Sequence, residues 1–316
     1  MKTVKPSRIQ ILTNQEVHEL YSNPVFNQSE REEYFSIDPH IERVFSALGK
    51  VETRIYLLLL IGYFRAKPVV PKFRLRDVKQ DVDYLYATYF PNREPKYPLI
   101  AKSTRATLIL KMYGLLGFTR FSKEDEQALF ERLQDIATIC TYPKYIFDEC
   151  LAFFGQKRIG LAGYSTLQDM ITSVLASERQ RTESILSRSM SDTTRIQLKK
   201  ILHTKGRLNQ LSAQKGSAKD FTPTELMREI ETHNTIKSVY QEIKNLINEL
   251  GLSQGNLTYY ASIIRHQSLY KIRRFPEWQG MLYIVCYLFF RYQETNDKLV
   301  TAFQYVTRKQ REATSA

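Results

Sequence analysis

The stretch "KSTRATLILKMYGLLGF" (Lys102–Phe118) carries the pattern that decides the fold. Leu108, Met112, Leu115 and Leu116 recur at the spacing of one helix face, so they predict a buried apolar stripe. The residues before this stripe are small hydroxyls and cations, where the helix dipole favours an acid. The stretch therefore predicts an amphipathic helix with a basic N-terminus, which we call its entrance.

The same helical pattern continues along the whole chain. Gly (12) and Pro (11) are scarce among 316 residues, and convincing strand alternation is absent. Capping boxes are expected at Thr13, Ser29 and Ser122, and Pro223 stands at a first helical position. We predict a mainly α, multi-helix fold with helices near 13–22, 29–36, 39–48, 51–65, 74–90, 103–117, 123–139, 143–156, 165–188, 193–203, 223–249, 256–272 and 277–310.

Two breaks divide this series of helices. "GQKRIGLAGYS" (Gly155–Ser165) holds three glycines and two cations, so we expect an exposed junction or hinge at 155–163. The polar, Gly- and Ser-containing stretch 203–223 predicts a mobile loop. The resulting prediction is two helical domains, 1–160 and 161–316, with DNA-binding elements that resemble a helix-turn-helix.

Several classes of function lack their sequence signals. Nucleotide-binding, hydrolase and metalloprotease motifs are absent, so the sequence predicts no enzyme, no cofactor and no metal. Three widely spaced cysteines indicate reduced thiols in a cytosol, and the start of the chain has no apolar signal segment. "IYLLLLIGYF" (Ile55–Phe64) is too short to span a bilayer and predicts a buried core helix, so no membrane partner is expected. A weaker alternative is a small metal-dependent nuclease that uses Asp77, Asp81 and Asp83.

The charge balance points to a polyanion. The chain carries 46 Lys and Arg against 33 Asp and Glu, a net charge of +13. At the entrance of the helix over 103–117, a bound phosphate would complement both the cations and the free N–H groups, and Ser103 or Thr104 is expected to cap the helix. With the preceding helix, this arrangement resembles a helix-turn-helix with a long connection. The DNA-binding residues expected here are Arg74, Arg76, Lys102, Ser103, Thr104, Arg105, Thr107 and Lys111.

Two further basic stretches, 157–166 and 265–274, could contact DNA. In the first, Ser165 or Thr166 is expected to serve as the N-cap of a long helix. In the second, aromatic residues lie between cations, which suits phosphate contact and stacking. For all three stretches the alternative is structural, namely solvated cations, ordinary caps, or cations that complement a helix dipole. The added candidates are Lys157, Arg158, Tyr164, Ser165 and Thr166, then Arg265, Lys271, Arg273 and Arg274.

Five stretches of the chain form a further pattern, namely "LTNQEVHELYSNPVFNQSEREEYFSIDPHIERVFSAL", "TRIYLLLLIGYFRAKPVVP", "KSTRATLILKMYGLLGFTRFS", "GYSTLQDMITSVLASERQR" and "LYKIRRFPEWQGMLYIVCYLFFRYQETNDKLVTAF". The third contains a Leu-Gly-Phe-x-x-Phe run, here Leu116, Gly117, Phe118 and Phe121. In this order the five stretches resemble the N-terminal part of the replicative transposases of the Tn-three family of bacterial transposons. The resemblance covers nearly the whole chain.

The resemblance implies a function for these helical domains. In that family they bind the terminal inverted repeats as duplex DNA and contribute to dimerisation, and the DDE-type catalytic domain lies beyond the part that this chain matches. We therefore expect sequence-specific DNA binding in transposition, no catalytic residue in this chain, and a bacterial cytoplasmic, nucleoid-associated location. The expected partners are duplex DNA, a second copy, and the rest of the transposase if the chain is a fragment. The alternative is a helical interaction or dimerisation module without DNA readout.

Overall fold

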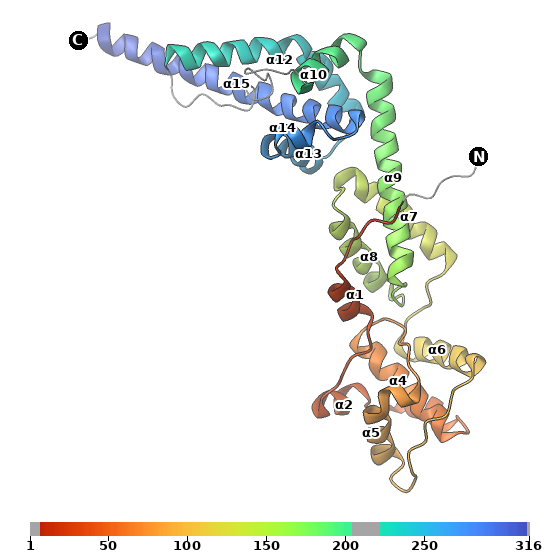
Figure 1. Ribbon diagram of the computed structural model, residues 1–316. Helices are drawn as coiled ribbons and strands as arrows, with labels where there is room; N and C mark the ends of the chain where they lie inside the picture. The colour runs from red at the N-terminus through yellow and green to blue at the C-terminus, as the bar shows by residue number, and fades with distance from the viewer. Residues whose placement is uncertain (1–6, 204–221, 315–316) are drawn as a thin grey trace. The chain divides into compact units, whose positions relative to one another are not determined.

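The computed structural model describes residues 7–203 and 222–314 (Figure 1). Every regular element in these residues is helical, which confirms the mainly α prediction. The predicted mobile loop falls almost wholly on 204–221, outside the described residues. The helices are α1 (Asn14–Tyr21), α2 (Gln28–Tyr34), α3 (Pro39–Ser46), α4 (Val51–Ala66), the 3-10 helix η1 (Leu75–Val78), α5 (Lys79–Tyr89), α6 (Lys102–Leu116), α7 (Lys123–Ile139), α8 (Pro143–Lys157), α9 (Tyr164–Ser189), α10 (Asp192–His203), α12 (Pro223–Leu250), α13 (Gln254–His266), α14 (Leu269–Ile272) and α15 (Glu277–Thr314).

Most predicted helices begin and end within one or two residues of the observed ones, and two of them divide. The helix expected over 74–90 consists of η1 followed by α5, and the one expected over 256–272 ends at His266 before the short α14. At η1 the Asp77 carboxylate accepts the backbone N–H of Arg74 at 3.0 Å and so caps the short turn.

The helix starts follow local capping chemistry. Thr13 and Glu16 form the predicted capping box, and Ser122 exchanges the same pair of bonds with Asp125. Ser29, however, is not a cap. Asn27 accepts the N–H of Glu30 and donates its own N–H to the Glu30 carboxylate, so the cap of α2 lies two residues earlier than predicted and the helix begins one residue earlier.

The chain divides into two compact units, which we call the first unit (1–134 and 142–174) and the second unit (135–141 and 175–316). The division after Val174 falls inside α9, whereas the sequence places the boundary near residue 160. Residues 155–163 are not a junction, because they lie inside the first unit. Their backbone is held there by isolated bridges of Ile159 with Thr119 and of Leu161 with Val69.

Helix α4 is the centre of the first unit. Its side chains from Ile55 to Phe64 are all buried, which confirms the predicted core helix, and α2, α3, α5 and α6 pack around it. Gly62 allows this packing, since a Cβ there would lie 2.3 Å from the Phe35 ring. Each fully buried leucine contributes roughly 1.5–3 kcal/mol, so this helix supplies much of the unit's stability.

The second unit is built on α12 and α15, which lie side by side in Figure 1. They run antiparallel, because His233 stacks on Tyr292 while Tyr240 reaches Phe289. Helix α13 packs on α15, and the buried pair Glu229 and Arg291 joins α12 to α15 at 3.0 Å. The core of this unit is thus separate from the one around α4.

Candidate nucleic-acid interface

The segment 65–120, which we call the basic surface segment, contains η1, α5 and α6 and carries a strong excess of cations. It holds twelve lysines and arginines but only four acids, so it supplies more than half of the net charge of +13. Seven of its cations were not among the predicted contacts. Of these, Lys72, Arg93, Lys96 and Arg120 are exposed and form no ion pair with any described residue. The scarcity of acids over the whole segment is the sequence signal that would have found them.

Three of the four acids in this segment are engaged within the fold. Asp81 is buried and accepts hydrogen bonds from Arg31 and Tyr63, and burial together with this bond raises the pKa of Tyr63. Asp83 accepts from the Tyr97 hydroxyl, and Asp77 caps η1. Asp77, Asp81 and Asp83 therefore do not form the metal cluster that a nuclease would need. No group of three His, Cys, Asp or Glu side chains in the described residues could hold a metal ion.

The entrance of α6 is open to solvent and basic. The helix begins at Lys102, its first turn contains no acid, and its N-cap Ala101 has no capping side chain. The expectation that Ser103 or Thr104 would cap the helix is wrong, because both lie inside it. Lys102 and Ser103 are exposed, and Lys102 forms no ion pair with a described residue. The first-turn N–H groups therefore remain available to an anion.

The predicted outward stripe of α6 is present in part. Thr107 and Lys111 are exposed, whereas Thr104 is half-buried and lines a groove of about 570 Å³ between the start of α4 and residues 98–101. Leu99, which is 82% exposed, lies on the rim of this groove. The Thr107 hydroxyl donates to the Ser103 carbonyl at 3.2 Å, so its oxygen can still accept hydrogen bonds.

Arg105 is held by the protein itself. Its Nη2 donates to the Pro71 carbonyl at 3.1 Å, and its Nε is buried with no hydrogen-bond partner among the described residues. This contact ties the start of α6 to the segment that follows α4. The side chain is half-buried, so Arg105 does not belong to the exposed cations.

Arg74 and Arg76 lie exposed at η1 in the same unit as α6. The connection from α5 to α6 runs from Phe90 to Ala101, so these two helices do not have the three- or four-residue turn of a helix-turn-helix. The helix-turn-helix predicted here is therefore not supported. What this part of the first unit offers is a set of exposed cations.

The second basic stretch serves mainly to hold the fold. Arg158 adopts a left-handed backbone (φ 51°), lies over the Phe118 ring at 4.8 Å, and donates to the carbonyls of Leu116 and Gly117 at 2.7 and 3.0 Å. It therefore caps the carboxyl end of α6, about 20 Å from the entrance of that helix. Lys157 is exposed and lies 4.9 Å from the Phe153 ring.

Tyr164 has a similar structural role. Its hydroxyl accepts the backbone N–H groups of Ile11 and Leu12 at 3.3 and 3.1 Å, which fastens the segment before α1 to α9. The expectation that Ser165 or Thr166 would be the N-cap of this helix is wrong, since α9 already begins at Tyr164. Both residues are exposed in its first turn.

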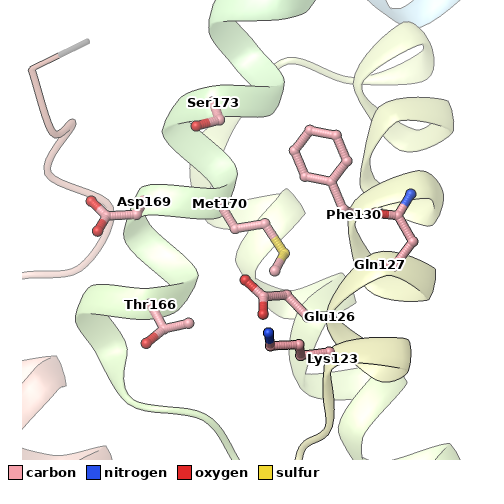
Figure 2. A pocket seen from close by; sticks show the side chains of 8 residues that line it. All are labelled: Lys123, Glu126, Gln127, Phe130, Thr166, Asp169, Met170 and Ser173. Atoms are coloured by element: carbon pink, nitrogen blue, oxygen red, sulfur yellow. The ribbon is translucent and has the colours of Figure 1, made fainter. Parts of the chain in front are cut away.

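Thr166 also lines a groove of about 700 Å³ between α7 and α9 of the first unit. Figure 2 shows Phe130 and Met170 directed toward the space between the two helices. Asp169 pairs with Arg8. With Lys123 as its single cation beside Glu126 and Asp169, this groove lacks the charge that a DNA phosphate requires.

The third basic stretch, 265–274, lies in the second unit. Some of its cations are engaged within the fold and the others are exposed. Arg265 pairs with Glu294, and Arg273 donates to the Leu202 carbonyl at 3.2 Å. Lys271 and Arg274 are exposed, and Arg274 lies 5.5 Å from the Tyr270 ring. Two of the four predicted cations here are thus available for an external partner.

Comparison with known proteins places the chain in a family. Residues 11–174 match the family described as a domain of unknown function, DUF4158, and the chain belongs to it. The match ends at Val174, the residue at which the first unit ends, so the family domain and the structural unit coincide there. No curated protein matches the chain. No helix within the described ranges is both long and apolar enough to cross a membrane.

Proposed function

We propose that this protein binds duplex DNA, and that it is the N-terminal recognition part of a replicative transposase that binds the terminal inverted repeats of its transposon. The observation that carries the proposal is the basic surface segment 65–120 around the open entrance of α6. Most of its exposed cations lack internal partners, and three of its four acids are hydrogen-bonded within the fold. The resemblance to Tn-three family transposases supports the same interpretation.

The physical argument rests on phosphate contacts. Lys72, Arg74, Arg76, Lys102 and Lys111 are exposed cations that can neutralise DNA phosphates and release counterions. The first-turn N–H groups of α6 add donors for one phosphate. Such contacts supply affinity and orientation, and Thr107 beside Lys111 can reach base edges. The proposal assigns no chemical step to this chain, and it locates the protein at the bacterial nucleoid.

A second candidate function is a helical interaction or dimerisation module. Exposed apolar residues on the second unit favour it, namely Met227 of α12 at 57% and Val300 and Phe303 of α15 at 57% and 73%. Large exposed apolar side chains that lie close together often mark protein contacts. The two functions are compatible in one chain, since the basic surface and these residues belong to different units.

The test is DNA binding by the full chain across salt concentrations. The probes are a duplex that carries the inverted repeat flanking the gene in its own genome and a scrambled duplex of equal length. We expect tighter binding to the repeat and a steep decrease of log K with log salt. Equal affinity for both duplexes would remove the sequence-specific part of the proposal, and absence of binding would leave the interaction module.

A further inference from the structure

Helices α12 and α13 are joined by a tight turn. Helix α12 ends at Leu250, Gly251 takes the left-handed conformation (φ 57°), and α13 begins at Gln254. Ser253 caps α13 by accepting the N–H of Asn256 at 3.1 Å. A three-residue turn that contains glycine is the connection of a helix-turn-helix, and the α5–α6 pair lacks it.

Helix α13 has two distinct faces. Leu257, Tyr260, Ala261 and Ile264 are buried in the core shared with α15. The opposite face carries no carboxylate and is rich in the side chains that hydrogen-bond base edges in the major groove. Its exposed members are Gln254, Gly255, Thr258, Tyr259, Arg265 and His266, with Ser262 half-buried among them.

The charge around this face suits a polyanion. No aspartate or glutamate occurs between Glu249 and Glu277, a stretch that contains all of α13 and α14. Lys271 and Arg274, just beyond α13, are exposed. The flanking helices α12 and α15 do carry acids, and Glu294 of α15 pairs with Arg265 at the end of α13.

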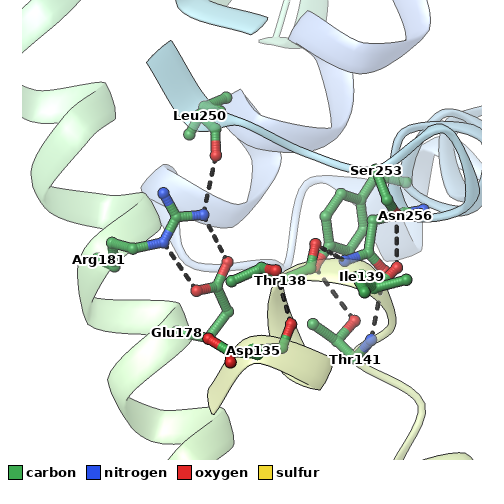
Figure 3. A network of polar contacts seen from close by, with 10 residues as sticks. Asp135, Thr138, Ile139, Thr141, Glu178, Arg181, Leu250, Ser253 and Asn256 are labelled. Atoms are coloured by element: carbon green, nitrogen blue, oxygen red, sulfur yellow. Dashed lines mark hydrogen bonds and ion pairs between the residues drawn. The ribbon is translucent and has the colours of Figure 1, made fainter. Parts of the chain in front are cut away.

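The turn and the start of α13 are fixed by hydrogen bonds within the second unit (Figure 3). The buried Asn256 amide donates to the Thr138 carbonyl at 3.1 Å and accepts the Thr141 N–H at 3.2 Å. Ser253 donates to the Ile139 carbonyl, and Arg181 donates to the Leu250 carbonyl at 2.8 Å. A recognition helix held in this way loses little conformational freedom when it binds DNA.

We propose that the carboxyl end of α12 (residues 247–250), the turn 251–253 and α13 form a helix-turn-helix in which α13 lies in the major groove of duplex DNA. Gln254 and Thr258 contact base edges, while Lys271 and Arg274 contact flanking phosphates. At 13 residues, α13 is about 20 Å long, which suits a major groove about 12 Å wide. The inference rests on the proposed function. It adds a second DNA-recognition element, which lies outside residues 11–174 that match the family.

The experiment uses the full chain and duplexes selected by it from a pool with a randomised core. The double variant Gln254→Ala/Thr258→Ala is compared with Gln241→Ala/Thr235→Ala, which removes the same side chains from exposed positions of α12. We expect the α13 variant to bind the selected duplex about tenfold or more weakly, with an unchanged salt slope and a footprint shortened at one segment. The α12 variant retains affinity and footprint.

A second variant excludes unfolding as the cause. Gln254→Glu places an acid in the first turn of α13, where the helix dipole favours it, so the melting temperature should hold or rise. The same acid opposes DNA, so affinity should fall severalfold. Binding of both α13 variants at the level of the α12 variant would overturn the inference while the proposed function stands. If the unmodified chain selects no duplex at all, the proposed function itself has failed and the inference fails with it.

Discussion

Residues 102–111 and 157–166 both place cations and hydroxyl side chains at the start of a helix in the first unit. In 102–111, Lys102 and Lys111 point to solvent without an ion partner among the described residues. In 157–166, Arg158 caps α6 and Tyr164 fastens the segment before α1, although Lys157 stays exposed. The difference shows that a basic, hydroxyl-rich helix start is available to a ligand only where the fold leaves its side chains unused.

The largest expected effect is a loss of DNA affinity when the exposed lysines of 102–111 are replaced. Lys102→Gln/Lys111→Gln removes two phosphate contacts, so affinity for duplex DNA should fall at least about tenfold at low salt and the salt slope should decrease by about two. Lys237→Gln/Lys244→Gln, on exposed positions of α12, changes the net charge equally and serves as the control. Equal losses in both variants would mean that only total charge matters.

The next effect concerns stability. Arg158→Ala removes two hydrogen bonds to the last carbonyls of α6 and the contact with Phe118, so it should lower the free energy of unfolding by about 1 kcal/mol. DNA affinity should stay within about twofold, since this side chain is already engaged. Urea denaturation and anisotropy on the same preparation measure both. A large loss of affinity with unchanged stability would show that Arg158 contacts DNA after all.

Arg105→Ala should behave like Arg158→Ala although it lies within the exposed stretch. Loss of the bond to the Pro71 carbonyl should cost roughly 1 kcal/mol of stability. The sequence predicts an effect on DNA affinity at this position, whereas its half-buried location predicts a lower melting temperature instead. Calorimetry and a binding titration on the same variant distinguish the two predictions. Reduced DNA affinity at an unchanged melting temperature would show that Arg105 contacts DNA.

The smallest expected effect is a change in thiol labelling. Burial raises the pKa of Cys150 to about 12, and the pKa of Cys286 is also raised by burial, so only the partly exposed Cys140 should react quickly with a thiol reagent near neutral pH. In Arg158→Ala, labelling of Cys150 on α8 should accelerate several-fold as the end of α8 opens more often. Lys102→Gln/Lys111→Gln should leave that rate unchanged, and acceleration there would mean that the entrance of α6 is structural too.

Local sequence patterns predicted the helices. Which side chains are available to a ligand depends on long-range contacts, which these patterns do not contain. The apolar run Ile55–Phe64 and the capping boxes at Thr13 and Ser122 are local, so they were predicted correctly. The cap of α2 was misplaced because Asn27 and Ser29 offer equivalent oxygens two residues apart.

The candidate site was harder to predict for the same reason. Arg105 finds its acceptor 34 residues away, and Arg158 reaches carbonyls 41 and 42 residues away. No helical wheel contains those partners. The local pattern of charge cannot distinguish these two arginines from Lys102 and Lys111, so the sequence grouped all four as DNA contacts. The division inside α9 was also hidden, because a continuous helix carries no break signal at Val174.

The salt dependence of duplex binding by the full chain tests the central claim most directly. The claim is that the exposed cations of 65–120 form a surface for DNA phosphates. The five contacts assigned to this segment predict that log K falls with log salt at a slope of about −4.5 or steeper between about 50 and 200 mM, since Lys271 and Arg274 can add to it. In Lys102→Gln/Lys111→Gln the slope should weaken by about two. A slope near zero, or one that the double variant leaves unchanged, would contradict the account.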